Sequence, residues 1–126
     1  MIDFKNGVSV FSKLKVVSNK TYEAFVIPLF TENESILETY KGIRDGVVFT
    51  NKRIISINVQ GLTGTKKDFT SLPYSKIQAF SVETAGILDF DSELDLWFSG
   101  IGSVRFEFSK DSDIATICKI ISERTL

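Results

Sequence analysis

The stretch with the clearest potential for chemistry is "GLTGTKKD", residues 61 to 68, where two glycines precede two lysines. Such loops can hold phosphate through backbone N–H groups and a lysine. A Walker A loop needs four residues between its glycines, whereas Gly61 and Gly64 have two residues between them. RNA-binding KH domains use a G-x-x-G loop between helices, but strand-like sequence flanks this one. The stretch therefore favours a tight hairpin turn over a phosphate site.

A second candidate is an acidic series with alternate spacing, Asp89, Asp91, Glu93 and Asp95. A calcium-binding EF-hand loop requires glycine at its sixth position and glutamate at its twelfth, and this chain has Leu94 and Gly100 there. The apolar residues between the acids instead predict a strand with its carboxylates on the solvent face. Because neighbouring carboxylates repel, we expect cations beside them or on a partner, and neither a metal nor a cofactor.

Few residues in this chain are suited to catalysis. There is no histidine, so the commonest general base and the commonest transition-metal ligand are both missing. The one cysteine, Cys118, falls on an apolar stripe without a histidine to activate it, which indicates a structural thiol. Carboxylates could act as a pair, but nothing in the sequence places two of them in a cleft. We therefore expect a protein that is not an enzyme.

Charge is segregated along the chain. Residues 41 to 76 hold seven lysines and arginines against two acids, whereas residues 83 to 113 hold eight acids against two bases. The net charge of −1 gives no overall attraction to nucleic acid, and none is expected as a partner. Two interpretations remain open: solvated sheet faces, or a surface where the basic part of one copy meets the acidic part of another copy or of a partner.

Seven runs of apolar and β-branched residues separated by turn residues predict seven strands after Glu34. They cover residues 35–41, 44–50, 53–60, 66–72, 76–84, 93–99 and 103–109. Before them, residues 8 to 17 alternate between polar and apolar as an extended arm or strand. A short helix follows, capped by Ser18 or Asn19 and ended by Pro28. Its apolar face is formed by Tyr22, Phe25, Val26 and Leu29.

The chain closes with a helix predicted over residues 111 to 124, capped by Asp111 or Ser112. Its apolar stripe consists of Ile114, Ile117, Cys118 and Ile121. With 126 residues, 43% of them apolar, we expect one domain with an N-terminal arm and helix (1–33), strands (34–110) and the closing helix. No apolar run approaches the roughly 20 residues of a membrane span, and a lone cysteine suggests no oxidising compartment, so we expect a cytoplasmic protein.

Three motifs occur in a characteristic order: "YKGIRDGVVFTNKRII", "VQGLTGTKKDFTSLPYSKIQAFSVETAG" and "DFDSELDLWFSG", with "VRFEF" and a closing helix after them. From about Glu34 to the end, the chain resembles the bacterial pleckstrin-homology-like (PH-like) domains. The resemblance implies a mainly β fold with α-helices: a bent seven-stranded antiparallel sandwich or partial barrel capped by a C-terminal helix, plus a short N-terminal helix. It also implies a cyclic homo-oligomer, five-fold, whose polar surface between adjacent protomers binds another protein.

The charge pattern and the resemblance together predict a partner or assembly surface on exposed strand faces and loops. Its predicted members are Arg44, Lys52, Arg53, Gln60, Lys66, Lys67, Glu83, Asp91 and Glu93. The alternative is peripheral binding of anionic lipid headgroups through Lys41, Arg44, Lys52 and Arg53. Phosphoinositide-binding PH domains carry cations around the loop that corresponds to "YKGIRDG", where Asp45 here weakens such a headgroup site.

Overall fold

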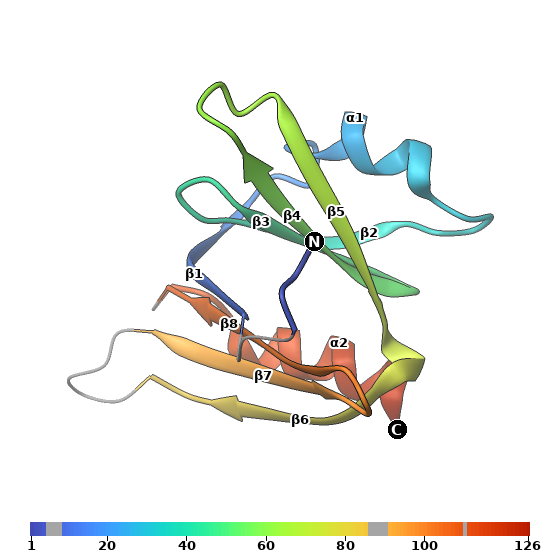
Figure 1. The fold of residues 1–126 in the computed structure, drawn as a ribbon. Helices are drawn as coiled ribbons and strands as arrows, with labels where there is room; N and C mark the ends of the chain where they lie inside the picture. Colours follow the sequence, from blue (N-terminus) through green and yellow to red (C-terminus); the bar gives the residue numbers. More distant parts are fainter. Residues whose placement is uncertain (5–8, 86–90, 110) are drawn as a thin grey trace.

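The computed structural model describes residues 1–4, 9–85, 91–109 and 111–126. Within them, eight strands form one curled sheet in the order β5-β4-β3-β2-β1-β8-β7-β6 (Figure 1). The strands are β1 (Ser9–Val17), β2 (Ile36–Lys41), β3 (Gly46–Thr50), β4 (Arg53–Gln60), β5 (Lys66–Pro73), β6 (Ile77–Glu83), β7 (Ser92–Phe98) and β8 (Gly102–Phe108). The helical elements are α1 (Glu23–Val26), the 3-10 turns η1 (Ile27–Leu29) and η2 (Tyr74–Lys76), and α2 (Ile114–Thr125).

The predicted fold class is confirmed: a bent, mainly antiparallel sheet closed by a C-terminal helix, with a short helix near the N-terminus. Each of the seven predicted runs coincides with one strand, β2 to β8, to within two residues at either end. The eighth strand is β1, which covers the stretch expected as an extended arm or strand. It pairs antiparallel with β2 and parallel with β8, so it joins the two halves of the sheet.

A bulge in β1 changes which of its side chains face the core. The register with β8 shifts between Phe11 and Leu14, and Lys13 lies there at a φ of 56°. As a result Phe11 and Leu14, three residues apart, are both buried in the main core. Simple alternation places these two side chains on opposite faces, so that expectation was wrong at the bulge.

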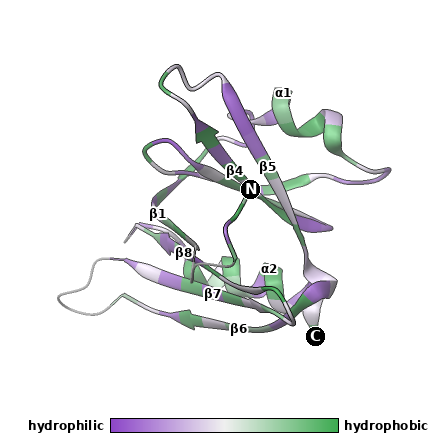
Figure 2. Cartoon of the chain, in the orientation of Figure 1, coloured by the Kyte–Doolittle hydropathy of each residue, from purple (hydrophilic) through white to green (hydrophobic). Residues whose placement is uncertain are grey.

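The two halves of the sheet differ in how many of their faces are covered. β3 is buried along its whole length because Val47 and Phe49 face the main core while Val48 faces a second cluster beneath α1. β7 instead alternates, with Leu94 and Leu96 buried in the main core. In Figure 2, β7 carries both hydrophilic and hydrophobic residues along its length. The outer face of β6, β7 and β8 is therefore the polar sheet face that meets solvent.

The first helix is one turn long and continues as η1, which contains Pro28. Proline ends the α-helical part, as predicted. Tyr22 and Val26 are buried in the second cluster, but Phe25 and Leu29 are exposed. The predicted apolar face was wrong for these two residues, because one α-helical turn followed by a 3-10 turn does not keep them on a single stripe.

The last helix packs against the main core through Ile117, Ile120 and Ile121. Its N-cap is Asp113, whose Oδ1 accepts the backbone N–H of Thr116 at 3.2 Å. The predicted caps at residues 111 and 112 were therefore wrong by one or two positions. Cys118 is half-buried, with its Sγ 3.9 Å from the Ser122 Oγ.

An ion pair between Arg53 and Glu34 fastens the chain that follows η1 to the turn between β3 and β4. Arg53 Nε donates to Glu34 Oε2 at 2.9 Å, and Arg53 Nη2 donates to Glu34 Oε1 at 3.0 Å. The Glu34 side chain is inaccessible to solvent. Burial opposes its ionisation, but hydrogen bonds from Arg53, Thr31 and Thr50 outweigh burial and hold the pKa of Glu34 below its ordinary value.

The substitution Glu34→Gln should lower the free energy of unfolding by about 3 kcal/mol at neutral pH, because it leaves the Arg53 guanidinium without its buried counter-charge. The folded pKa of Glu34 lies below its unfolded value of about 4.3, so the ionised carboxylate stabilises the fold above that value. This stabilisation is lost as the pH falls through the folded pKa. Urea unfolding of both proteins should therefore show the deficit narrowing below about pH 4.

The control for this measurement is Glu23→Gln, which changes an exposed carboxylate in the first turn of α1. It should leave the free energy of unfolding within about 0.5 kcal/mol of the wild-type value, both at neutral pH and below about pH 4. A deficit in Glu34→Gln that stays constant with pH would contradict the role assigned to the ion pair.

Candidate functional site

The structure divides the predicted surface residues among three places. One group lies in the turn between β3 and β4, a second lies around the β2–β3 and β4–β5 turns, and a third lies on β6 and β7. In an antiparallel meander, alternate turns lie at the same end of the sheet, so the second group is at the opposite end of β3 and β4 from the first.

The β3–β4 turn holds its cations in intrachain bonds. Lys52 Nζ donates to the Thr31 Oγ1 at 3.0 Å and to the Glu32 carbonyl oxygen at 2.5 Å. Arg53, besides its pair with Glu34, donates from Nη2 to the Leu29 carbonyl oxygen at 2.6 Å. Both cations therefore hold the neighbouring loop in place. The structure does not bring them together with Lys41 and Arg44, as the predicted lipid site requires.

The second group forms what we call the basic end: Lys41, Arg44, Lys66 and Lys67. Arg44 ties its two turns together, because its Nη2 donates to the Gly61 carbonyl oxygen at 2.6 Å. Lys67 Nζ lies 4.8 Å from the centre of the Phe25 ring and donates to the Gly64 carbonyl oxygen at 3.2 Å. Gln60 pairs with Lys66 across the β4–β5 ladder.

The glycine-rich stretch is the hairpin turn between β4 and β5, as the glycine spacing predicts. Gly61 and Gly64 have φ values of 76° and 68°, in the left-handed region that glycine adopts without strain. Leu62 between them is fully exposed, and Ile43 in the β2–β3 turn is 78% exposed. The basic end therefore presents two aliphatic side chains among its cations.

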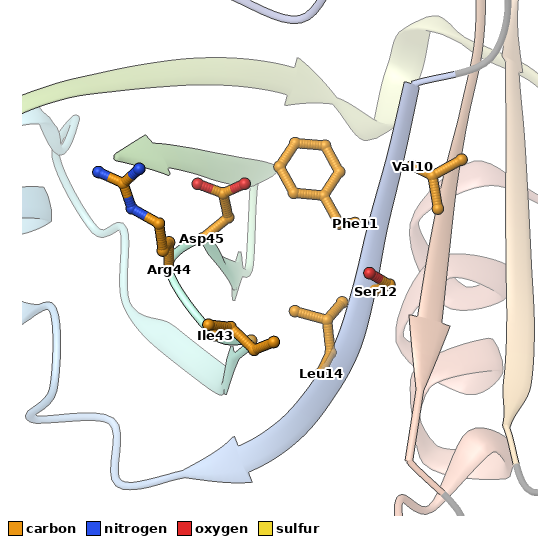
Figure 3. A pocket seen from close by; sticks show the side chains of 8 residues that line it. Val10, Phe11, Ser12, Leu14, Ile43, Arg44 and Asp45 are labelled. Atoms are coloured by element: carbon orange, nitrogen blue, oxygen red, sulfur yellow. The ribbon is translucent and has the colours of Figure 1, made fainter. Parts of the chain in front are cut away.

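A hollow of about 270 Å³ lies between β1 and the β2–β3 turn (Figure 3). Phe11, Leu14 and Ile43 supply apolar walls, and the Arg44 side chain extends away from β1 toward its bond with the β4–β5 turn. The carboxylate of Asp45 accepts the backbone N–H of Val59 at 2.9 Å. The β2–β3 turn is therefore a poor receptor for a multivalent anion, because it carries the Asp45 carboxylate and its Arg44 guanidinium points away from the hollow.

The third group lies on what we call the acidic face, the outer face of β6, β7 and β8. Glu83, Glu93 and Glu107 stand opposite one another on the three strands, in one cross-strand row. In the next row, Asp95 stands opposite Arg105. Asp91, a predicted site residue, immediately precedes β7, and Asp89 lies outside the described residues.

Arg105 is the one cation in these three strands, all of which the structure describes. Its Nε and Nη2 donate to the two oxygens of Asp95 at 2.8 and 3.1 Å, and its Nη1 lies 3.6 Å from Glu93 Oε2. The bonds to Asp95 and the charge of Glu93 raise the pKa of Arg105 still further. Burial raises the pKa of Glu93, Arg105 opposes this, and the charges of Glu83, Glu107 and Asp95 add to the rise.

Sequence reasoning missed Arg105, Glu107 and Trp97 as members of this face. Trp97 follows the same alternation as Glu93 and Asp95 and is 42% exposed. The clean alternation of residues 104 to 108 already indicated which side chains leave the core. The missing information was the register between β7 and β8, which places Arg105 opposite Asp95.

Other classes of site find little support in the described part of the chain. No group of three or more His, Cys, Asp or Glu side chains there could hold a metal ion. No helix among the same residues has the length and apolarity needed to cross a bilayer. The charged basic end and acidic face therefore remain the candidate functional surfaces.

A curled antiparallel sheet closed at one end by a C-terminal helix is the architecture of the PH-domain class. The model of the family described as "Bacterial PH domain" matches residues 6–125. The chain belongs to this family of bacterial PH domains.

Relatives and solved structures agree with this assignment. The uncharacterized Bacillus subtilis protein YjqA is 45% identical over 96 residues, 75% of this chain and 77% of YjqA. The uncharacterized B. subtilis protein YozO is 31% identical over 92% of this chain and 96% of its own. A crystal structure of a DUF1696 family protein with a pleckstrin-homology domain from Shewanella loihica has a TM-score of 0.80 and 39% identity, covering 92% of this chain and all of that one. A pleckstrin homology domain from Shewanella amazonensis has a TM-score of 0.68 and 40% identity, covering 87% and 90%.

The substitution Arg105→Gln should lower the free energy of unfolding slightly at neutral pH, because Arg105 forms an exposed ion pair. The pKa of Glu93 is raised in the folded state, so its ionisation destabilises the fold as the pH rises. Arg105 offsets part of this destabilisation, and the substitution removes that offset. Urea unfolding from about pH 4 to pH 7 should show the deficit growing with pH. The control, Lys119→Gln, removes an exposed cation from α2 and should show no such growth. A deficit in Arg105→Gln that is independent of pH would contradict this account.

Proposed function

We propose that this domain is a non-enzymatic binding module that assembles head to tail with copies of itself into a five-fold ring and recruits a protein partner on the polar surface so formed. The observation that carries the proposal is the row of three glutamates, Glu83, Glu93 and Glu107, on strands whose single cation is Arg105. Like charges opposite one another on a sheet are unfavourable, and cations from outside the strands relieve them. The raised pKa of Glu93 supports the same inference.

The position of the basic end supports a head-to-tail arrangement. The turns that carry it lie at the top of the molecule in Figure 1, and the β6–β8 half that carries the acidic face lies at the bottom. Two patches of opposite charge at different places make a heterologous contact, which closes into a ring when repeated with a constant rotation. Complementary charges fix the register of such a contact and speed its formation. The resemblance of the three sequence motifs implies the same kind of assembly.

Light scattering after gel filtration tests the assembly. The wild-type domain should elute with a mass of about 70 kDa, five copies of 14.1 kDa, and this mass should fall as salt screens the contact. The double variant Lys66→Glu, Lys67→Glu should be monomeric, because it places carboxylates against the acidic face. So should Glu83→Lys, Glu107→Lys, which leaves the contact between Glu93 and Arg105 intact.

Combining the two pairs of charge-reversing substitutions in one chain gives the decisive comparison. A chain that carries all four substitutions restores opposite charges at the contact and should assemble again. Lys20→Glu, an exposed lysine away from both patches in sequence, serves as the control and should leave the mass unchanged. A wild-type domain that is monomeric at micromolar concentration would contradict the proposed ring. Failure of the four combined substitutions to restore assembly would contradict the proposed charge contact.

A second candidate function is peripheral binding to an anionic membrane, favoured by the exposed aliphatic tips of the basic end. Ile43 and Leu62 project from two turns that Arg44 ties together, with Lys41 and Lys66 at the neighbouring strand ends. Aliphatic tips inserted below a lipid headgroup layer, with cations at the surface, are a common mode of peripheral binding. This candidate uses Lys41 and Arg44 but not the engaged Lys52 and Arg53.

Cosedimentation with liposomes tests this candidate. The domain should pellet with vesicles containing about 30% phosphatidylserine and not with neutral ones, and binding should weaken as salt rises. Ile43→Ser with Leu62→Ser should reduce binding about tenfold while preserving its salt dependence, because only the inserted side chains are lost. If the domain does not pellet with anionic vesicles at low salt, it does not bind membranes in this way. If the double variant binds as tightly as the wild type, Ile43 and Leu62 do not insert into the lipid.

A further inference from the structure

The first four residues of the chain pass between the two halves of the sheet (Figure 1). At one end, the Met1 amino group lies 2.9 Å from the Asp68 carboxylate on β5. At the other end, the Phe4 ring meets the Phe98 ring of β7 edge to face, with centroids 6.3 Å apart at 75°. Between them, Ile2 is only 3% exposed and belongs to the main core. The segment therefore bridges β5 and β7.

The segment is seated as a peptide ligand would be. Ile2 and Phe4 face inward while Met1 and Asp3 are exposed. The backbone approaches the β7–β8 turn closely, since the Phe4 carbonyl oxygen lies 3.2 Å from where a Cβ would stand on Gly102. Gly102 has a φ of 142°, so both its conformation and this approach require glycine. The turn is thus shaped around a backbone that lies against it.

These four residues do not fill all the space beside the β7–β8 turn. A hollow of about 480 Å³ adjoins them, lined by Met1 to Phe4 together with Gly100 and Ile101. Ile101 on its rim is 58% exposed. This volume lies within the range of roughly 300–1,000 Å³ that accommodates small ligands in proteins. A longer or bulkier peptide could therefore make contacts that the chain's own segment does not make.

Unpartnered polar atoms lie on the same inner face of β4 and β5. Asp68, which meets the Met1 amino group, accepts a hydrogen bond from Thr70 Oγ1 at 2.9 Å. Asn58 stands opposite Asp68 and Ser56 stands opposite Thr70. The Asn58 Oδ1 and the Ser56 Oγ are both buried, and neither has a hydrogen-bond partner among the described residues. Buried polar atoms without partners are rare, and a peptide backbone offers both donors and acceptors.

We propose that the surface against which the chain's first four residues lie, from β5 to the β7–β8 turn, is a peptide-binding site that these residues occupy as an intramolecular ligand. The partner it fits is a peptide with two apolar side chains two residues apart, in the places of Ile2 and Phe4, and a further bulky apolar group in the hollow beside Ile101. A tethered segment acts at an effective concentration of order millimolar, so a partner needs the added contacts of the hollow to displace it. The proposal extends the protein-binding role above and does not depend on assembly.

Fluorescence polarisation tests the site with a labelled peptide in trans. The probe is MIDF followed by Gly-Gly and a C-terminal fluorophore, and the control probe is MSDS in the same format. In the full chain, Ile2→Ser with Phe4→Ser removes both anchors of the tethered segment. This variant should bind MIDF with micromolar affinity and at least about tenfold more tightly than the wild type, and neither protein should bind MSDS.

A second pair of measurements examines the hollow. Replacing the first residue of the probe with tryptophan should strengthen its binding to the double variant about threefold or more, since the added ring fills the apolar space. Adding Ile101→Glu to the variant should cancel that gain. Ile27→Ser, which changes an exposed aliphatic residue on η1, is the matched control and should change no affinity.

Circular dichroism and gel filtration establish that the double variant is folded. If it is unfolded, Phe4→Ser alone replaces it, because Phe4 is only partly buried and Ile2 keeps its place in the core. A folded variant that binds MIDF no better than the wild type, or that binds MSDS equally well, overturns the proposal. Peptide binding without the tryptophan gain overturns the part assigned to the hollow.

Discussion

Backbone pairing through β1 is the interaction on which the rest of this structure depends. β1 stands between β2 and β8, so it turns two potential sheet edges into paired strands and makes one continuous sheet from two halves. The bulge within it lets both Phe11 and Leu14 enter a core that also receives side chains from α2. The basic end and the acidic face, which belong to different halves, thereby have a fixed relation to each other.

Coverage of the sheet decides where polar chemistry can be displayed. α1 buries Val48 and Ile55 on the outside of the β3–β4 half, while the outer face of β6 to β8 is left to solvent. Charged side chains gather on that open face, and Arg105 binds two of their carboxylates. The same principle explains the sequence: unbroken apolar runs where both faces are covered, and alternation where one face is wet.

The fold could be predicted largely from local patterns, and the surface could not. Turn residues and strand periodicity located β2 to β8, and Asp113 displaced the predicted cap of α2 only because its carboxylate reaches the Thr116 amide. Pairing across the sheet has no comparable local signal. The pairing of β7 with β8 sets Arg105 against Asp95. The bulge that turns Phe11 and Leu14 to the same side arises where β1 pairs with β8, about 95 residues later in the chain. Lys52 and Arg53 are likewise bound by residues 20 and 24 positions earlier in the chain, Glu32 and Leu29.

Charge counted along a sequence therefore overstates the charge that a folded surface offers to a partner. Among the seven cations of residues 41 to 76, Arg53 is held by a buried carboxylate and Lys52 by a neighbouring loop, whereas Lys41 and Lys66 remain exposed at strand ends. The acidic region retains more of its charge, because three glutamates in register share the neighbourhood of a single arginine already bound by Asp95. Removing this row of carboxylates from water without adding cations costs free energy, whereas cations placed beside the row offset the repulsion between the carboxylates. The acidic face thus keeps more uncompensated charge than the basic region does.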